Sequence, residues 1–181
     1  RIAADLHWSL TAEESIDLAR ELSSFNPWFL EAPVAPECIE ALRKVAKQCE
    51  QKIAVGEEWR TLHEARMRID REACHIVQPE MGHTGITEFL RIGRHAEKYG
   101  LTVIPHATIG SGIFLAASLQ AAASLDCATD HEYQHSIFGP FRHFTGDRLR
   151  CEEGAFTVLD APGLGVEPSE AMKKAITLIP V

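Results

Sequence analysis

The chain has 181 residues, of which 45% are hydrophobic and 24% are charged, and its formal net charge is −8. This composition is typical of a folded globular protein, and the acidic balance argues against a nucleic-acid surface, which needs a basic face. No apolar run reaches the roughly 20 residues that span a bilayer and no secretory signal opens the chain, so we expect neither a membrane contact nor secretion. The five cysteines are scattered, which favours free thiols in a reducing cytoplasm.

Short apolar runs alternate with amphipathic helical stretches along the first two thirds of the chain. The predicted strands cover residues 1–5, 28–30, 52–55, 75–77 and 101–104, and the predicted helices that follow them cover residues 11–23, 39–50, 62–69, 86–99 and 113–123. Thr11 and Glu14 form a capping-box pattern at the first helix. Residues 129–133 are a weaker sixth strand, residues 144–157 have the glycines and charges of a hairpin, and residues 162–165 form a turn.

This alternation predicts βα units and a parallel sheet. The short period between strands favours an α/β barrel of the (β/α)₈ type, of which the chain supplies about six βα units. We expect residues 1–140 to form the C-terminal part of the barrel and residues 141–181 to form a C-terminal hairpin and tail.

Each apolar run ends close to one ionisable residue. In chain order these are Asp5, Glu31, Glu57, Glu80, His106 and, in the weak sixth segment, Glu132. A single acid at a strand end is usually a helix N-cap or a solvated loop residue, but parallel strands would bring all of these to one rim. Three clustered carboxylates suit Mg²⁺, and without a cation they would repel one another.

The ordered set of motifs resembles the enolase superfamily, and within it the branch of mandelate racemase and muconate lactonizing enzyme. The motifs are Asp5-Leu6-His7, Leu30-Glu31-Ala32-Pro33, Ala54-Val55-Gly56-Glu57, Gln78-Pro79-Glu80, Ile104-Pro105-His106 and His131-Glu132-Tyr133. The resemblance implies that Asp5, Glu31 and Glu57 bind Mg²⁺, and that His106 is paired with the acid at residue 80.

Two residues depart from the pattern of that branch. Ala32 stands where the family usually has an acid, but the metal-binding Glu31 is kept. Glu80 replaces the usual aspartate of the Asp–His pair and is one methylene longer, so the orientation of His106 depends on how Glu80 is placed. A carboxylate that is hydrogen-bonded to His106 would fix its tautomer and favour its protonated form.

The resemblance implies proton abstraction next to a substrate carboxylate, which gives an enediolate whose charge a divalent metal stabilises. His106 is then the base, or the acid that returns the proton, and Glu132 binds a substrate carboxylate oxygen. His7 lies two residues after Asp5, so on a strand it would point to the same side. An Asp-x-His there resembles galactonate and mannonate dehydratases, in which the His helps the β-hydroxyl leave, although a surface His is the plain alternative.

The function that we expect is a Mg²⁺-dependent lyase that dehydrates a sugar acid to a 2-keto-3-deoxy acid. The alternatives are a racemase or epimerase of a carboxylate substrate, and a catalytically inactive member. The resemblance also implies a homo-oligomer, and an N-terminal capping domain and first barrel strands that this chain lacks. His83 is expected only to line the mouth of the site. Gly110-Ser111-Gly112 could hold an anion or form a simple turn.

Overall fold

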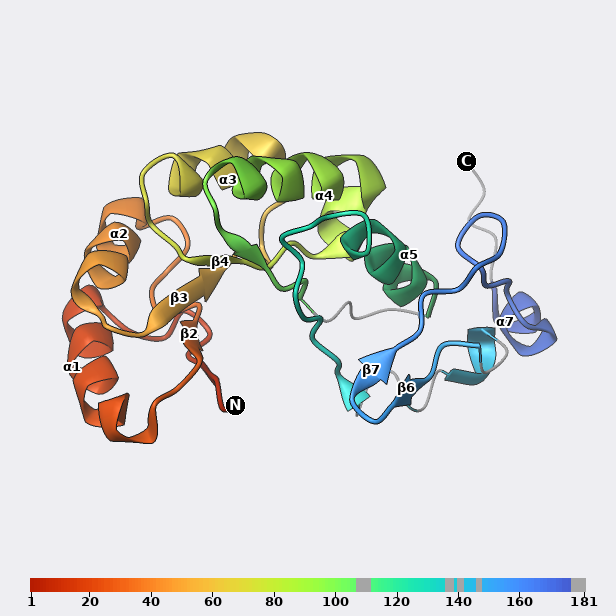
Figure 1. Ribbon diagram of the computed structural model, residues 1–181, viewed down its shortest axis with the longest axis horizontal. Helices are drawn as coiled ribbons and strands as arrows, with labels where there is room; N and C mark the ends of the chain where they lie inside the picture. Colours follow the sequence, from red (N-terminus) through yellow and green to blue (C-terminus); the bar gives the residue numbers. More distant parts are fainter. Residues whose placement is uncertain (107–111, 136–138, 140–141, 146–147, 177–181) are drawn as a thin grey trace.

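Five short parallel strands form one sheet in the order β1-β2-β3-β4-β5, and helices lie along its outer side (Figure 1). The structure is a computed structural model that describes residues 1–106, 112–135, 139, 142–145 and 148–176. The strands are β1 (Ala4–Asp5), β2 (Phe29–Glu31), β3 (Lys52–Val55), β4 (Ile76–Val77) and β5 (Thr102–Val103). The helices of this part are α1 (Ala12–Leu22), α2 (Ile39–Gln48), α3 (Leu62–Ile69), α4 (Met81–Lys98) and α5 (Gly112–Ala122), and a short 3₁₀ helix, η1 (Ser23–Phe25), follows α1.

The two faces of the sheet pack against different partners because successive side chains of a strand point to opposite sides. Leu30, Ile53 and Val77 face the helices and belong to the main hydrophobic core. A second, smaller cluster lies on the other face and contains Phe29, Ala54, Ile76 and Ile104. The sheet is therefore buried on both sides, as expected of parallel strands inside an α/β barrel.

The predicted elements of this region are confirmed with two exceptions. Thr11 and Glu14 form the expected capping box of α1. Helix α4 starts at Met81, earlier than the predicted residue 86, and crosses a kink at Gly85, whose φ is 62°. Gly82 and Gly85 weaken the helical pattern there, but the Glu80 side chain caps the helix by accepting from the Gly82 N–H.

The prediction of a sixth strand at residues 129–133 is wrong. The backbone there makes an isolated parallel bridge, Val103↔Ala128, and then donates from Thr129 to Val103 and from Glu132 to Pro105. These donors are three residues apart, whereas a parallel ladder repeats every two residues, so the segment follows β5 without joining the sheet.

The C-terminal segment folds as the predicted hairpin and packs on α5. Strands β6 (Cys151–Glu152) and β7 (Ala155–Phe156) pair in antiparallel fashion, between a 3₁₀ helix, η2 (Arg142–Thr145), and helix α7 (Glu170–Ala175). Leu115 and Leu119 of α5 form a second core cluster with Leu149. Gly110 and Ser111 of the predicted turn lie outside the described residues. None of the described helices combines the length and the apolar run that a membrane crossing requires.

Candidate functional site

The alternation of the inward face continues past the strand ends and places the predicted site residues. Glu31 lies two residues after the inward-facing Phe29, and Asp5 is paired with Glu31 in the register of β1 and β2. Glu80 lies four residues after Ile76, and His106 lies two residues after Ile104. These side chains therefore leave the sheet on the same side, at the carboxyl end of the strands, where active sites of this fold are found.

Glu57 reaches the same rim through a glycine turn. Gly56 has a φ of 133°, and a Cβ at this position would lie 3.0 Å from the Gln78 backbone nitrogen and 3.1 Å from the Trp59 ring. Only glycine fits this close approach without strain. The turn directs Glu57 toward His106, whose Nε2 lies 3.7 Å from Glu57 Oε2.

The buried Glu80 and the half-buried His106 form a pair in which Glu80 is held at both of its carboxylate oxygens. The two carboxylate oxygens of Glu80 have separate partners. Oε1 accepts from the Gly82 N–H at 2.7 Å, and Oε2 lies 2.7 Å from His106 Nδ1. The first turn of α4 thus fixes the carboxylate, and the carboxylate fixes the imidazole. The longer side chain of glutamate makes both contacts, so the departure from aspartate leaves the acid–His pair intact.

The Nε2 atom of His106 faces further carboxylates. Glu57 Oε2 and Glu132 Oε2 lie 3.7 and 3.9 Å away. Burial lowers the pKa of His106, but the hydrogen bond with Glu80 and the charges of Glu132 and Glu57 outweigh it and raise the pKa to about 9. With Nδ1 bound to Glu80, the ring carries its second proton on Nε2 at neutral pH, pointing into the rim.

Glu31 is a second buried acid of the rim. Its side chain is buried, and this burial raises its pKa to about 7 despite a hydrogen bond from the Gln78 side chain. The charges of Glu132, Asp5 and Glu57 raise the pKa further, so all three carboxylates lie near Glu31. The predicted convergence of the strand-end residues is therefore observed for Asp5, Glu31, Glu57, Glu80, His106 and Glu132.

The rim has a donor set that fits a hard divalent cation. Ligand atoms of Glu31, His106 and Glu132 lie within 4.8 Å of one another. His106 is a poor ligand in this group because its raised pKa keeps Nε2 protonated at neutral pH. The carboxylates of Asp5, Glu31 and Glu57 are the oxygen ligands that Mg²⁺ prefers, and a cation would offset the repulsion that raises the pKa of Glu31.

The prediction that His7 lies on a strand and points to the same side as Asp5 is wrong. Strand β1 ends at Asp5, and His7 and Trp8 follow in the left-handed region with φ values of 44° and 58°. The Asp5 Oδ1 atom accepts from the His7 N–H at 2.9 Å and holds this turn, so strand alternation no longer fixes where His7 points. His7 is exposed, and its ring lies against Trp8 with 4.4 Å between ring centroids.

Gln78, for which the sequence predicts no role, and His83, which is expected to line the mouth of the site, both contribute to it. Gln78 is fully buried beneath Glu31 and follows the same alternation, so the spacing from Glu80 could have identified it. His83 lies in the first turn of α4 and lines a pocket of about 260 Å³ together with Glu57, Glu80, Gly82, His106 and Phe114. The expected position of His83 is confirmed, and the early start of α4 places it there. His131, by contrast, is half-buried against Ser118 and the Glu132 carbonyl, as a structural histidine is.

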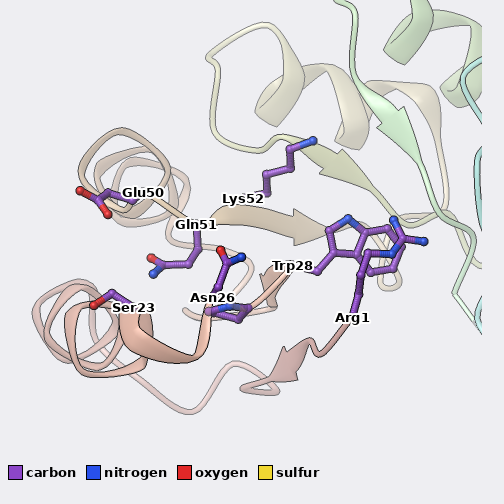
Figure 2. Close-up of a pocket in the computed structure, with 8 residues that line it drawn as sticks. Arg1, Ser23, Asn26, Trp28, Glu50, Gln51 and Lys52 are labelled. Atoms are coloured by element: carbon purple, nitrogen blue, oxygen red, sulfur yellow. The ribbon is translucent and has the colours of Figure 1, made fainter.

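A larger pocket lies away from this rim. Its volume is about 350 Å³, and Figure 2 shows that Arg1, Trp28 and Lys52 are among the residues that line it. Lys52 is the first residue of β3, so this pocket is at the opposite end of the strands from Glu57. The Arg1 guanidinium stacks on the Trp28 ring at 3.6 Å and also binds Asp130 at 2.6 Å. This pocket is not part of the acid and histidine cluster.

Comparisons with known proteins agree with this geometry. A family model described as "Enolase C-terminal domain-like" matches residues 1–172. The chain is 30% identical over 166 residues to D-xylonate dehydratase of Haloferax volcanii, a match that covers 91% of this chain and 40% of that protein. It is 28% identical over 179 residues to D-galactarolactone cycloisomerase of Agrobacterium fabrum, covering 92% and 46%.

A solved structure of a member of the enolase superfamily from Agrobacterium tumefaciens superposes with a TM-score of 0.93. The two sequences are 53% identical, and the match covers 96% of this chain and 45% of that one. The barrel-type α/β fold expected from the sequence is thereby confirmed. The chain spans less than half the length of the curated relatives that it matches.

Proposed function

This chain belongs to the enolase C-terminal domain-like family, and from that premise we propose that it forms the catalytic end of a Mg²⁺-dependent lyase that dehydrates a sugar acid to a 2-keto-3-deoxy acid. One observation carries the proposal. A histidine whose orientation is fixed by a buried carboxylate presents Nε2 to a cluster of acids at the carboxyl end of parallel strands.

The residues divide the proton chemistry between them. Glu80 holds His106 through Nδ1, so the proton that His106 exchanges is the one on Nε2. With a pKa of about 9, His106 at neutral pH is an acid that can protonate a leaving β-hydroxyl or return a proton to the α-carbon. Once that proton is given up, Nε2 is the base that removes the α-proton, and it passes this proton to the leaving β-hydroxyl, which departs as water.

Asp5, Glu31 and Glu57 would hold the Mg²⁺. When bound, the ion offsets the negative charge that builds on the substrate carboxylate as the α-proton is removed. Glu132 borders the same space, with Oε2 at 3.9 Å from His106 Nε2, and is the group that we assign to a substrate carboxylate oxygen. Gln78 keeps Glu31 in place from below.

A curated relative supports the dehydratase assignment. D-xylonate dehydratase carries that reaction in its name, and its match covers nearly all of this chain. The second candidate is an isomerase, a racemase or epimerase included, because a relative at comparable coverage is a D-galactarolactone cycloisomerase. Both reactions begin with proton transfer next to a carboxylate, so the His106–Glu80 pair serves either.

The test is a product assay on the full natural protein with Mg²⁺ and a panel of mono- and diacid sugars. A dehydratase gives a 2-keto-3-deoxy acid, and His106→Asn and Glu57→Gln abolish its formation. Exchange of the α-proton with solvent deuterium without a keto acid identifies the isomerase. Bound Mg²⁺ with neither product nor exchange would identify a catalytically inactive member.

The remaining expectations are part of the same proposal. All five cysteines are free thiols, in keeping with a cytoplasmic protein. We propose a small sugar acid as the only substrate partner and a homo-oligomer as the working form. We also propose residues 1–140 as the barrel portion and residues 141–181 as its C-terminal hairpin and tail.

A further inference from the structure

The pocket beside His106 contains a second histidine that has no role in the proton chemistry above. We propose that His83 Nε2 accepts a hydrogen bond from a hydroxyl group of the substrate, so that the site favours polyhydroxylated acids. This inference rests on the proposed function, because it names a substrate feature that the same site selects. The pocket is lined by Glu57, Glu80, Gly82, His83, His106 and Phe114 and has a volume of about 260 Å³.

The backbone fixes the tautomer of His83. Its Nδ1 atom lies 2.8 Å from the carbonyl oxygen of Glu57, and a carbonyl can only accept, so Nδ1 carries the proton and donates it. The neutral ring then has a lone pair on Nε2. Because Nδ1 is occupied by Glu57, Nε2 is the polar atom of this side chain that a ligand in the pocket can reach.

The two histidines of the pocket therefore offer complementary groups. His106 presents a protonated Nε2, whereas the tautomer of His83 that the Glu57 carbonyl selects has its acceptor at Nε2. A hydroxyl group can accept from the first or donate to the second, and a carbon chain with several hydroxyls can do both. A simple aliphatic acid cannot make the hydrogen bond to His83, and because His83 is exposed and open to water, such an acid loses only the net free energy of one hydrogen bond.

Phe114 adds an apolar ring to the lining of the pocket. Its side chain is 43% exposed although it is a large hydrophobe. Gly82 leaves space next to it, because a Cβ there would lie 4.0 Å from the Phe114 ring and 3.1 Å from Glu80 Oε1. A polar histidine and an apolar ring in the lining of one pocket fit the hydroxyl and C–H groups of a sugar acid chain.

Two substitutions test the contributions of the two ring nitrogens of His83 separately. In His83→Asn the amide nitrogen takes the place of Nδ1 and can still donate to the Glu57 carbonyl, but nothing replaces Nε2. In His83→Gln the amide reaches the place of Nε2, but the contact with Glu57 is lost. Each variant is assayed for Mg²⁺ affinity by calorimetry and for turnover of an aldonic acid and of deoxy analogues that each lack one hydroxyl.

We expect His83→Asn to keep the Mg²⁺ affinity and to lower the preference for the aldonic acid over one deoxy analogue about tenfold, the size of one hydrogen bond. His83→Gln should retain more of that preference. The inference is overturned if His83→Asn leaves the preference unchanged while His83→Gln weakens Mg²⁺ binding, since His83 would then only position Glu57. If the wild-type protein neither exchanges the α-proton of any acid nor forms a keto acid, the proposed function itself has failed.

Discussion

Glu31 offers a sharp test of the electrostatics of the rim, through the substitution Glu31→Gln. The carboxylate is buried, and its pKa is raised to about 7 by that burial and by the charges of Glu132, Asp5 and Glu57. In the unfolded chain the same group has an ordinary pKa near 4.5. The folded state therefore binds a proton that the unfolded state releases, and this group lowers the stability of the metal-free protein as the pH rises from 4.5 to 7.

The size of the effect follows from the shift. Each pKa unit corresponds to about 1.4 kcal/mol, so the ionised Glu31 costs roughly 3 kcal/mol of unfolding free energy at pH 8. Glutamine has nearly the same shape, carries no charge and can still accept from Gln78. We therefore expect metal-free Glu31→Gln to be more stable than the wild type by up to about 3 kcal/mol at pH 8 and nearly equal to it at pH 4.5.

Mg²⁺ should remove most of this difference in stability. At a concentration of 100 times its Kd, the ion adds about 2.7 kcal/mol to the wild type, and much less to a variant that has lost a ligand. The assay is urea unfolding at pH 4.5 and 8, with either EDTA or Mg²⁺. The reasoning is refuted if Glu31→Gln is no more stable than the wild type at pH 8 in EDTA, or if Mg²⁺ stabilises both proteins equally.

Three further predictions follow from the rim. In Glu80→Asp the shorter side chain cannot both cap α4 and hold His106, and the misplaced His106 should lower kcat/KM by about a hundredfold in the product assay. An unchanged kcat/KM would contradict the argument that the length of glutamate is needed. NMR of the metal-free protein should show the His106 imidazole titrating near pH 9, and at a lower pH in Glu80→Gln. The raised pKa of His106 stabilises the fold fully below pH 6.5, and this contribution is lost as the pH rises through 9. Titration near 6.5 in both proteins would show that the Glu80–His106 pair is absent. Gly56→Ala should lower the free energy of unfolding in urea by about 2 kcal/mol or more, because the new Cβ meets the Gln78 backbone nitrogen. The control Gly100→Ala, where φ is 66° and no atom lies close, should lower it by only about 1 kcal/mol. Equal losses in the two variants would contradict the packing argument.

The strand-end residues could be predicted because the rule that places them is local. In a strand, side chains two residues apart share a face, and parallel strands end on the same rim, so Glu31 and His106 were found without any knowledge of the tertiary contacts. Asp5 follows from the same rule through its register with Glu31. The fold class followed from the alternation of strands and helices for the same reason.

The rest depends on backbone turns that residue spacing does not specify. Strand alternation predicts only that His7 points to the same side as Asp5, whereas the resemblance gives its catalytic role. The orientation is wrong because the chain leaves β1 at Asp5 and enters a left-handed turn. The role of His83 depends on the early start of α4, which brings its ring to the Glu57 carbonyl. The predicted sixth strand fails because its hydrogen bonds to β5 do not follow the two-residue repeat of a ladder.

The central claim is that the rim removes or returns a proton next to a substrate carboxylate, and NMR in deuterium oxide tests it most directly. The full natural protein with Mg²⁺ is incubated with a panel of sugar acids, beside His106→Asn. The account predicts that the α-proton of at least one acid is lost or exchanged, that this loss requires Mg²⁺, and that His106→Asn slows it by at least a hundredfold, the size of a general acid–base contribution. The account is contradicted if no α-proton is lost while Mg²⁺ is bound, or if His106→Asn exchanges as fast as the wild type.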